Sequence, residues 1–196
     1  MEVNLSAADR ELEITRLSAL YGTPLRRHFV LHINEATAEW WTSVKRQRDS
    51  EVVLFIRRRN GNLILHTKDF YPPGTLRVPS GGILAGESLS TAVHREALEE
   101  TGLKIDIERF LAVIEFEFHC QGCVMPFSSY LFLLRETGGE LQTMDKEEHI
   151  AAFVEAPFSD LLSIAERLEN VPQSWHDWGQ FRALPHRLAA ELLQDL

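Results

Sequence analysis

Residues 80–103, SGGILAGESLSTAVHREALEETGL, determine how the rest of the chain is interpreted. Glu96, Glu99 and Glu100 stand at positions i, i+3 and i+4, a spacing that places three carboxylates on one face of a helix. Like charges this close destabilise a helix unless a cation neutralises them. Carboxylate oxygens suit a hard divalent cation, so the spacing predicts a metal site.

The flanks of this helix supply a start, an end and a packing face. Ser88 is expected as the N-cap, and Gly102 lies where a left-handed residue commonly ends a helix. The face opposite the glutamates carries Leu89, Ala92, Val93 and Ala97. This apolar face is expected to pack on a sheet and to turn the glutamates towards a cleft. Gly81 and Gly82 allow the backbone to approach a metal or a phosphate closely.

Arg95 adjoins the glutamates and is able to hold a carboxylate with a two-pronged hydrogen bond. An isolated EALEE run is typical of a solvated surface helix, and that interpretation is the alternative. The glycines, the outlying Glu87 and the Arg95–Glu96 pair all stand at fixed distances from the run. This joint pattern favours a functional site.

The complete pattern resembles the Nudix box, which is G, five residues, E, seven residues, then R-E-U-x-E-E-x-G-U, with U aliphatic. Its specified positions are filled by Gly81, Glu87, Arg95, Glu96, Ala97, Glu99, Glu100, Gly102 and Leu103. The resemblance implies the Nudix fold, an α/β/α sandwich with a mixed sheet between helices, over about residues 50–168.

The resemblance also implies roles for individual residues. Glu96, Glu99 and Glu100 match the positions that bind Mg²⁺ or Mn²⁺, and the backbone carbonyl of Ser80 is a further expected ligand. Arg95 is expected to orient these glutamates.

Three further box residues are expected to be structural. Glu87 would brace the loop and the helix, and Gly81 and Gly102 would shape the backbone. A general base or extra ligand commonly comes from a late loop, where Glu148 and Glu147 are the candidates. For both of these, a plain surface carboxylate is the alternative.

The implied activity is metal-dependent hydrolysis of a phosphoanhydride bond in a nucleoside diphosphate linked to another moiety X. The metal would neutralise the diphosphate, activate a water and hold the leaving oxygen. A glutamate would take the proton of that water. The alternative is a non-catalytic module that binds a nucleotide on the same fold, because fold alone does not determine function. The complete acidic box favours the enzyme.

Residues outside the box are expected to recognise the small nucleotide-type substrate. Arg57 and Arg59 share one face at the end of a predicted strand and are candidates for phosphate contact. A solvated strand end is the alternative. Trp41, with Trp40, Phe70 and Tyr71, is a candidate for stacking on a base, although core or dimer packing is the commoner use of such rings.

Composition narrows the class of protein. The chain has 196 residues, of which 44% are hydrophobic and 25% are charged, and its net charge is −9. These values are typical of a globular protein and argue against one that coats nucleic acid with a basic face. No apolar run approaches the roughly 20 residues of a membrane span, and no secretory signal is recognisable, so a cytoplasmic location is expected. Cys120 and Cys123 are expected to flank a hairpin turn.

Periodicity predicts the order of the elements. Helices are expected at 7–21, 35–48, 88–101, 158–168 and 184–194, and strands at 28–33, 51–58, 63–67, 75–78, 107–118, 124–135 and 149–155. Pro185 is expected in the first turn of the last helix. Phe110 and Phe118 are expected on one face of their strand. Residues 1–48 are interpreted as an appendage to a domain at 49–196, and as a possible homodimer interface.

Overall fold

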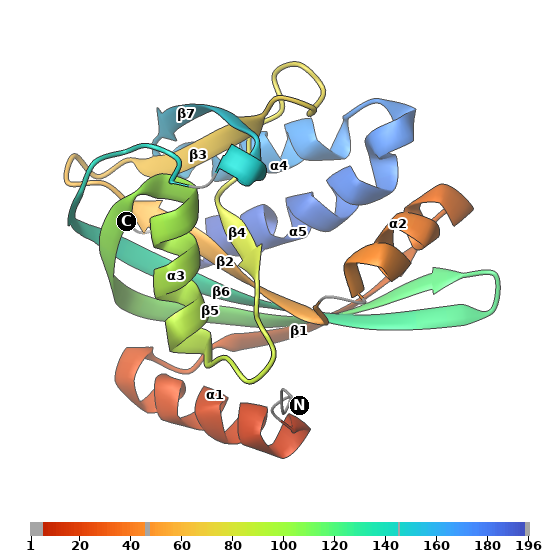
Figure 1. Ribbon diagram of the computed structural model, residues 1–196, viewed down its shortest axis with the longest axis horizontal. Helices are drawn as coiled ribbons and strands as arrows, with labels where there is room; N and C mark the ends of the chain where they lie inside the picture. Colours follow the sequence, from red (N-terminus) through yellow and green to blue (C-terminus); the bar gives the residue numbers. More distant parts are fainter. Residues whose placement is uncertain (1–5, 46–47, 145, 195–196) are drawn as a thin grey trace.

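A mixed sheet forms the centre of the fold in the computed structural model, which describes residues 6–45, 48–144 and 146–194 (Figure 1). Its strands are β1 (Leu25–His32), β2 (Ser50–Arg57), β3 (Leu63–Lys68), β4 (Ser80–Gly82), β5 (Leu103–Cys120), β6 (Cys123–Gly139) and β7 (Ile150–Ala156). The order across the sheet is β1-β5-β6-β2-β3-β7, and β4 pairs with β2 beside this path. The β1–β5 and β2–β6 pairs are parallel, and the other pairs are antiparallel.

Helices cover both faces of the sheet. They are α1 (Ala7–Tyr21), α2 (Glu35–Lys45), α3 (Leu89–Thr101), α4 (Leu161–Glu169) and α5 (His176–Leu192). The short 3-10 turns are η1 (Lys146–Glu148), η2 (Phe158–Asp160) and η3 (Gln173–Trp175). Helices α1 and α3 pack on one face, and α2, α4 and α5 pack on the other. The predicted α/β/α sandwich is confirmed.

Strand β2 explains how one short run serves both cores. Val52 and Leu54 point into the α1/α3 core, whereas Val53 and Phe55 point into the α2/α4/α5 core. A strand covered on both faces carries a continuous apolar run, and VVLFI is such a run. The N-terminal part of the chain joins the same sheet, because β1 pairs with β5 from Leu25 to His32.

The predicted ends of two helices are confirmed by their caps. The Ser6 side chain accepts a hydrogen bond from the Asp9 amide at the start of α1. The Ser88 side chain accepts one from the Thr91 amide at the start of α3. Gly102 follows α3 in the left-handed region, with φ 70°. These caps fix where the box helix begins and ends.

Two sequence predictions about strands are wrong. Residues 75–78 do not form a strand, because this segment makes a single bridge to β3 at His66↔Arg77 before the chain joins β2 as β4. Phe110 does not share a face with Phe118. A register irregularity between Phe110 and Ala112 turns Phe110 towards the α1/α3 core, where its ring stacks on Phe132 at 4.5 Å.

The last helix also differs from its prediction. It begins at His176, so Pro185 lies inside α5 and not in its first turn. Proline removes one hydrogen bond from a helix interior. Here the buried face of α5, which includes Phe181 and Leu188, packs on the sheet core and outweighs that loss.

The predicted hairpin turn at the two cysteines is confirmed. Cys120 pairs with Cys123 across the β5–β6 hairpin, and both are free thiols. Gln121 and Gly122 have positive φ, as a tight hairpin turn of two residues requires. Within the described part of the chain, no helix is long and apolar enough to cross a membrane.

Candidate metal and phosphate site

The three box glutamates differ in burial. Glu96 is 5% exposed, Glu100 is 0% exposed, and the Glu99 side chain is 44% exposed. The apolar face of α3, with Leu89 and Val93 fully buried, holds the helix against the sheet and turns the first two glutamates inward. Neither carboxylate oxygen of Glu100 accepts a hydrogen bond from a described residue. Buried carboxylates without donors are costly, so this site calls for a cation.

Burial and repulsion raise the pKa of both buried glutamates. Burial raises the pKa of Glu100 to about 8 and that of Glu96 to about 7, and the charge of Glu148 adds to both shifts. A divalent cation would reverse this balance by favouring the ionised forms. The cluster therefore has the chemistry of a metal site.

Arg95 joins the box loop to the glutamates. Its Nε and Nη2 each donate to Glu87 at 2.8 Å, in a two-pronged contact. Its Nη1 donates to Glu96 at 2.7 Å and to Glu99 at 2.9 Å, and Nη2 also donates to the Gly82 carbonyl at 2.8 Å. The arginine thus sets the direction of two carboxylates and fixes the loop beside them.

Helix α1 braces the same loop from outside the box. Glu13 accepts a hydrogen bond from the Leu89 amide at 2.5 Å, in the first turn of α3. Arg10 pairs with Glu13 at 2.5 Å and donates to the Glu87 carbonyl at 3.2 Å. Glu87 itself accepts a hydrogen bond from the Leu84 amide at 2.9 Å. A carboxylate at a helix N-terminus satisfies a free amide and is favoured by the helix dipole.

Two box glycines occupy places that no side chain fits. A Cβ on Gly81 would lie 1.8 Å from the carboxyl carbon of Glu96. A Cβ on Gly102 would lie 2.5 Å from the Glu140 carbonyl oxygen, and its φ of +70° disfavours other residues. The close approach expected of Gly81 is therefore an approach to the glutamate cluster.

Of the two late-loop candidates, Glu148 faces the cluster. Lys68 Nζ lies 2.7 Å from Glu148 Oε2 and 4.0 Å from Glu100 Oε1. Burial opposes ionisation of Glu148, but the hydrogen bond and the charge of Lys68, together with Glu100 and Arg77, outweigh it and lower the pKa of Glu148. Glu147 is exposed. The structure therefore brings together Glu96, Glu100 and Glu148.

A buried polar network lies behind Ser80. Arg77 Nη1 donates to the Ser80 hydroxyl at 2.9 Å, and that hydroxyl donates to Glu51 at 3.3 Å. Arg182 Nη1 lies 2.9 Å and 2.8 Å from the two oxygens of Glu51. Burial works against ionisation of Glu51, but Arg182 outweighs it and keeps the pKa of Glu51 below its ordinary value. The network holds the strand that precedes the box.

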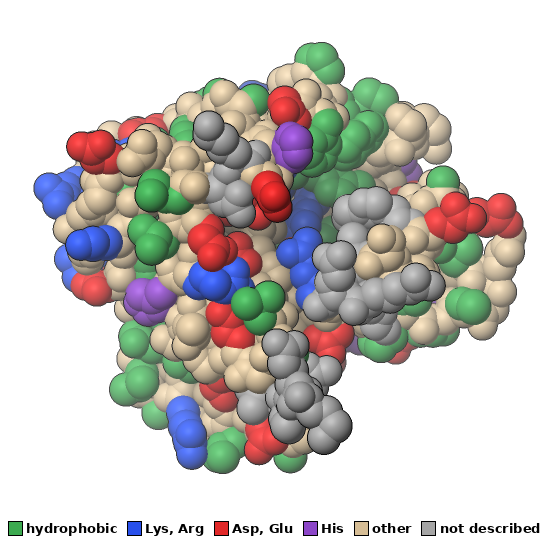
Figure 2. Space-filling view, in the orientation of Figure 1, with side chains coloured by type: hydrophobic (Ala, Val, Ile, Leu, Met, Phe, Trp, Pro, Cys, Tyr) green, Lys and Arg blue, Asp and Glu red, His purple; other side chains and the backbone are tan. Residues whose placement is uncertain are grey.

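Lys68, Arg77 and Arg182 bring positive charge to the site in an acidic protein. Burial acts to lower the pKa of Arg77, but Tyr71, which accepts a hydrogen bond from Nε at 2.8 Å, together with Glu100 and Glu51 raises it. Figure 2 shows acidic and basic side chains gathered over and beside α3, around a hollow in this face. Sequence reasoning missed all three cations. The one available indication of these cations in the sequence was that charged residues stand next to apolar runs.

The structure does not bring Arg57 or Arg59 to the glutamates. Arg57 ends β2 and pairs with Glu108 at 2.6 Å, and Arg59 donates to the Thr137 carbonyl at 3.1 Å. Strand β4 pairs with β2 no farther along than Val53. Arg57 lies four residues beyond Val53 along the strand, which is about 13 Å. These arginines line a separate surface depression of about 420 Å³.

The aromatic candidates divide between core and rim. Trp41 is 3% exposed and packs against Phe118 at 4.5 Å and Phe181 at 5.0 Å, so it belongs to the core. The Trp40 side chain lies outside the described part of the structure. Phe70 is 52% exposed and stacks on Trp175 at 6.3 Å.

The carboxylates of the cluster suit a hard metal cation, although most of them are paired with arginine or lysine side chains of the protein. Among the described residues, no group of three or more His, Cys, Asp or Glu side chains is already arranged to hold a metal ion. Arg95 engages Glu96 and Glu99, and Lys68 engages Glu148. The free oxygens of Glu100 fit a metal, and the other carboxylates would turn from these cations towards it.

Comparisons with known proteins agree with the family that the box pattern indicates. A family model described as the NUDIX domain matches residues 46–178. The NAD-capped RNA hydrolase NudC of Pasteurella multocida is 32% identical over 107 residues, which are 53% of this chain and 38% of that protein. The putative nudix hydrolase 1 of Caenorhabditis elegans is 35% identical over 79 residues, which are 40% of this chain and 20% of that protein.

The chain thus spans well under half the length of these curated relatives. Among solved structures, a UDP-X diphosphatase is similar with a TM-score of 0.50 and 19% identity. The match covers 80% of this chain and 71% of that one. At this identity the likeness concerns the fold.

Proposed function

The chain belongs to the Nudix family, and on that premise we propose that it hydrolyses a phosphoanhydride bond in a small nucleoside-diphosphate-type substrate, using Mg²⁺ or Mn²⁺. The observation that carries this proposal is the pair of buried carboxylates at Glu96 and Glu100. The charge of Glu148 repels both carboxylates, and neither oxygen of Glu100 accepts a hydrogen bond from a described residue. Such an arrangement is costly unless a cation occupies it.

The protein's own groups then have separate tasks. Glu96, Glu99 and Glu100, with the Ser80 carbonyl, would hold the metal, which supplies charge neutralisation and lowers the pKa of a bound water. Arg95 keeps the glutamates directed through hydrogen bonds to Glu96 and Glu99, and it holds the loop through Gly82 and Glu87.

Glu148 is the proposed general base. Lys68 keeps it ionised, so its carboxylate is able to accept a proton from the attacking water. Beyond Arg95, Lys68 and Arg77 are the cations that act on the Glu100 carboxylate. Lys68 is better placed for phosphate contact than Arg57 and Arg59.

The test is a panel of dinucleotides, nucleotide sugars and nucleoside triphosphates with Mg²⁺ or Mn²⁺, with phosphatase-coupled detection of phosphate. Glu100→Gln is expected to lower kcat by orders of magnitude. Glu169→Gln is the matched control, because Glu169 pairs with Arg187 at 2.5 Å and not with the box. Saturable binding without turnover of any compound would instead establish the non-catalytic nucleotide-binding module.

Assembly is a separate matter. The homodimer prediction relied in part on the tryptophans, and Trp41 is not available for an interface because it is buried within its own core. Helix α1 likewise packs Ile14 and Leu17 against its own sheet. Light scattering during size-exclusion chromatography will determine whether the protein is a monomer or a dimer.

A further inference from the structure

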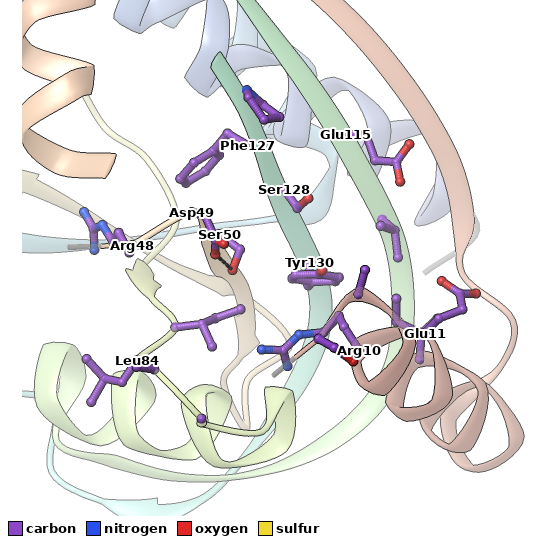
Figure 3. Close-up of a pocket in the computed structure, with 18 of the residues that line it drawn as sticks. Arg10, Glu11, Arg48, Asp49, Ser50, Leu84, Glu115, Phe127, Ser128 and Tyr130 are labelled. Atoms are coloured by element: carbon purple, nitrogen blue, oxygen red, sulfur yellow. Dashed lines mark hydrogen bonds between the residues drawn. The ribbon is translucent and has the colours of Figure 1, made fainter. Parts of the chain in front are cut away.

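A cavity of about 510 Å³ lies between α1, the loop that follows β4, and strands β5 and β6 (Figure 3). Its volume falls within the range of small-molecule sites, about 300–1,000 Å³. The α3 glutamates are not among its lining residues. The cavity is therefore a space beside the box, distinct from the carboxylates.

The lining is polar and balanced in charge. It contains the basic side chains of Arg10, Arg26 and Arg48 and the acidic side chains of Glu11, Asp49 and Glu115. Figure 3 shows Ser128 and Tyr130 following one another along β6, with Arg10 reaching towards Tyr130 from α1. The Arg10 guanidinium lies 5.9 Å from the centre of the Tyr130 ring.

This combination selects a chemical class. Arginines only donate hydrogen bonds and carboxylates only accept them, whereas a sugar hydroxyl does both. Equal numbers of the two charges give no net attraction for a phosphate, and the polar lining suits no lipid or other wholly apolar group. Arg10 and Arg26 already pair with Glu13 and Glu11. An arginine has five N–H donors and a carboxylate has several lone pairs, so an uncharged moiety rich in hydroxyl groups suits those that are left over.

The cavity is joined to the box through β4 and its loop. Leu84 and Gly86 line it and belong to the loop between Gly82 and Glu87. Arg48 also lines it, and its Cδ lies 2.1 Å from where a Cβ on Gly82 would stand. The Gly82 carbonyl in turn accepts a hydrogen bond from Arg95. A substrate whose phosphates meet the glutamates would reach the cavity by extending along this loop.

One wall of the cavity is outside the matched family region. Helix α1 contributes residues from Ser6 to Ile14, and β1 contributes Arg26, whereas the family match begins at residue 46. The wall is also fixed in place, because Arg10 donates to the Glu87 carbonyl. The N-terminal segment thus adds a recognition surface of this chain's own.

We propose that this cavity binds the sugar of a nucleoside diphosphate sugar, with α1 as its outer wall. The proposal rests on the proposed function for the position of the phosphates. The cavity itself is tested through affinity, so that its failure differs from a failure of catalysis.

The test fills the cavity from α1. Ala7 lines the cavity and Ala8 does not, and both are exposed, so Ala7→Phe and Ala8→Phe form a matched pair. The ligands are ADP-ribose and the ADP, GDP and UDP derivatives of glucose, with nucleoside triphosphates as comparators. We expect Ala7→Phe to raise KM for the preferred nucleotide sugar at least tenfold with kcat within twofold. Ala8→Phe and the triphosphates should show no such change.

Two results would overturn the proposed sugar site and leave the proposed catalysis intact. One is an active enzyme whose KM for nucleotide sugars is the same in Ala7→Phe and Ala8→Phe. The other is a wild-type preference for triphosphates over every nucleotide sugar. If no compound is turned over, the proposed function fails, and calorimetric titration with Mg²⁺ and the same nucleotide sugars tests the cavity alone. Equal binding to both variants, or no binding to the wild type, then refutes it.

Discussion

Substituting Glu100 by Gln is expected to stabilise the metal-free protein while it removes catalysis. The folded protein keeps Glu100 fully buried, with a pKa raised to about 8 from an ordinary value of 4.5. An acid whose pKa is raised on folding favours folding only while it stays protonated. Its contribution is complete below about pH 4.5 and is lost as the pH rises towards 8.

The magnitude follows from these two pKa values. At pH 7 the unfolded chain has released the proton and the folded chain has largely kept it, which costs the wild type about 3 kcal/mol relative to a side chain that does not titrate. At pH 5 the same cost is only about 1 kcal/mol. A buried amide without partners adds its own penalty of about 1–3 kcal/mol, but that penalty does not depend on pH.

The measurement is urea denaturation in EDTA at pH 5 and pH 7, followed by circular dichroism. The stability of Glu100→Gln relative to the wild type should rise by about 2 kcal/mol between the two pH values. Glu99→Gln is the control, because that side chain is 44% exposed and should show little change. With saturating Mg²⁺ the order should reverse, since the metal binds the wild type and stabilises it by mass action.

A difference between Glu100→Gln and the wild type that is independent of pH would refute this reasoning. It would mean that Glu100 is ionised in the folded, metal-free protein. Its pKa would then not be raised, and a metal would not be needed to keep it ionised. Retention of full kcat by Glu100→Gln would separately remove the metal-binding role proposed for this residue.

Three further perturbations probe the supports of the site. Gly81→Ala places a methyl group against the Glu96 carboxylate, so kcat should fall about 100-fold with a native circular dichroism spectrum, and unchanged turnover would contradict the crowding. Arg182→Met leaves Glu51 buried without its guanidinium and should lower the free energy of unfolding by about 3–5 kcal/mol. Adding Glu51→Gln should restore part of that stability, and an equal loss in the double variant argues against the ion pair. Glu13→Gln weakens the hydrogen bond to the Leu89 amide at the start of α3 and should lower the free energy of unfolding by about 1 kcal/mol in thermal unfolding. The control is Glu11→Gln, in an exposed ion pair, and an equal loss there would contradict this expectation.

The box could be predicted in detail because its pattern is local. Glu96 and Glu100 share a face since the helix repeats every 3.6 residues, whatever surrounds it. The same local rules gave the caps at Ser88 and Gly102 and the hairpin turn between the cysteines, which the structure confirms.

Errors arose where local patterns competed with long-range packing. Pro185 is a common first-turn residue, yet it lies inside α5 because that helix is held by a buried face and not by propensity. Phe110 fits an alternating strand, but an irregularity in the β5–β6 register moves it to the other core. Such irregularities depend on the partner strand, which no run of one strand specifies.

The sequence by itself therefore determined the carboxylates of this site, the arginine among them and the helix that carries them. Only the tertiary structure decided which cations meet those carboxylates. Lys68 lies outside the box, on β3, and the order of the strands brings it to Glu100. The packing of α5 brings Arg182 to Ser80, just before the box. Helical spacing is fixed by hydrogen bonds between near neighbours, whereas contacts between distant segments depend on the register and stacking of the whole sheet.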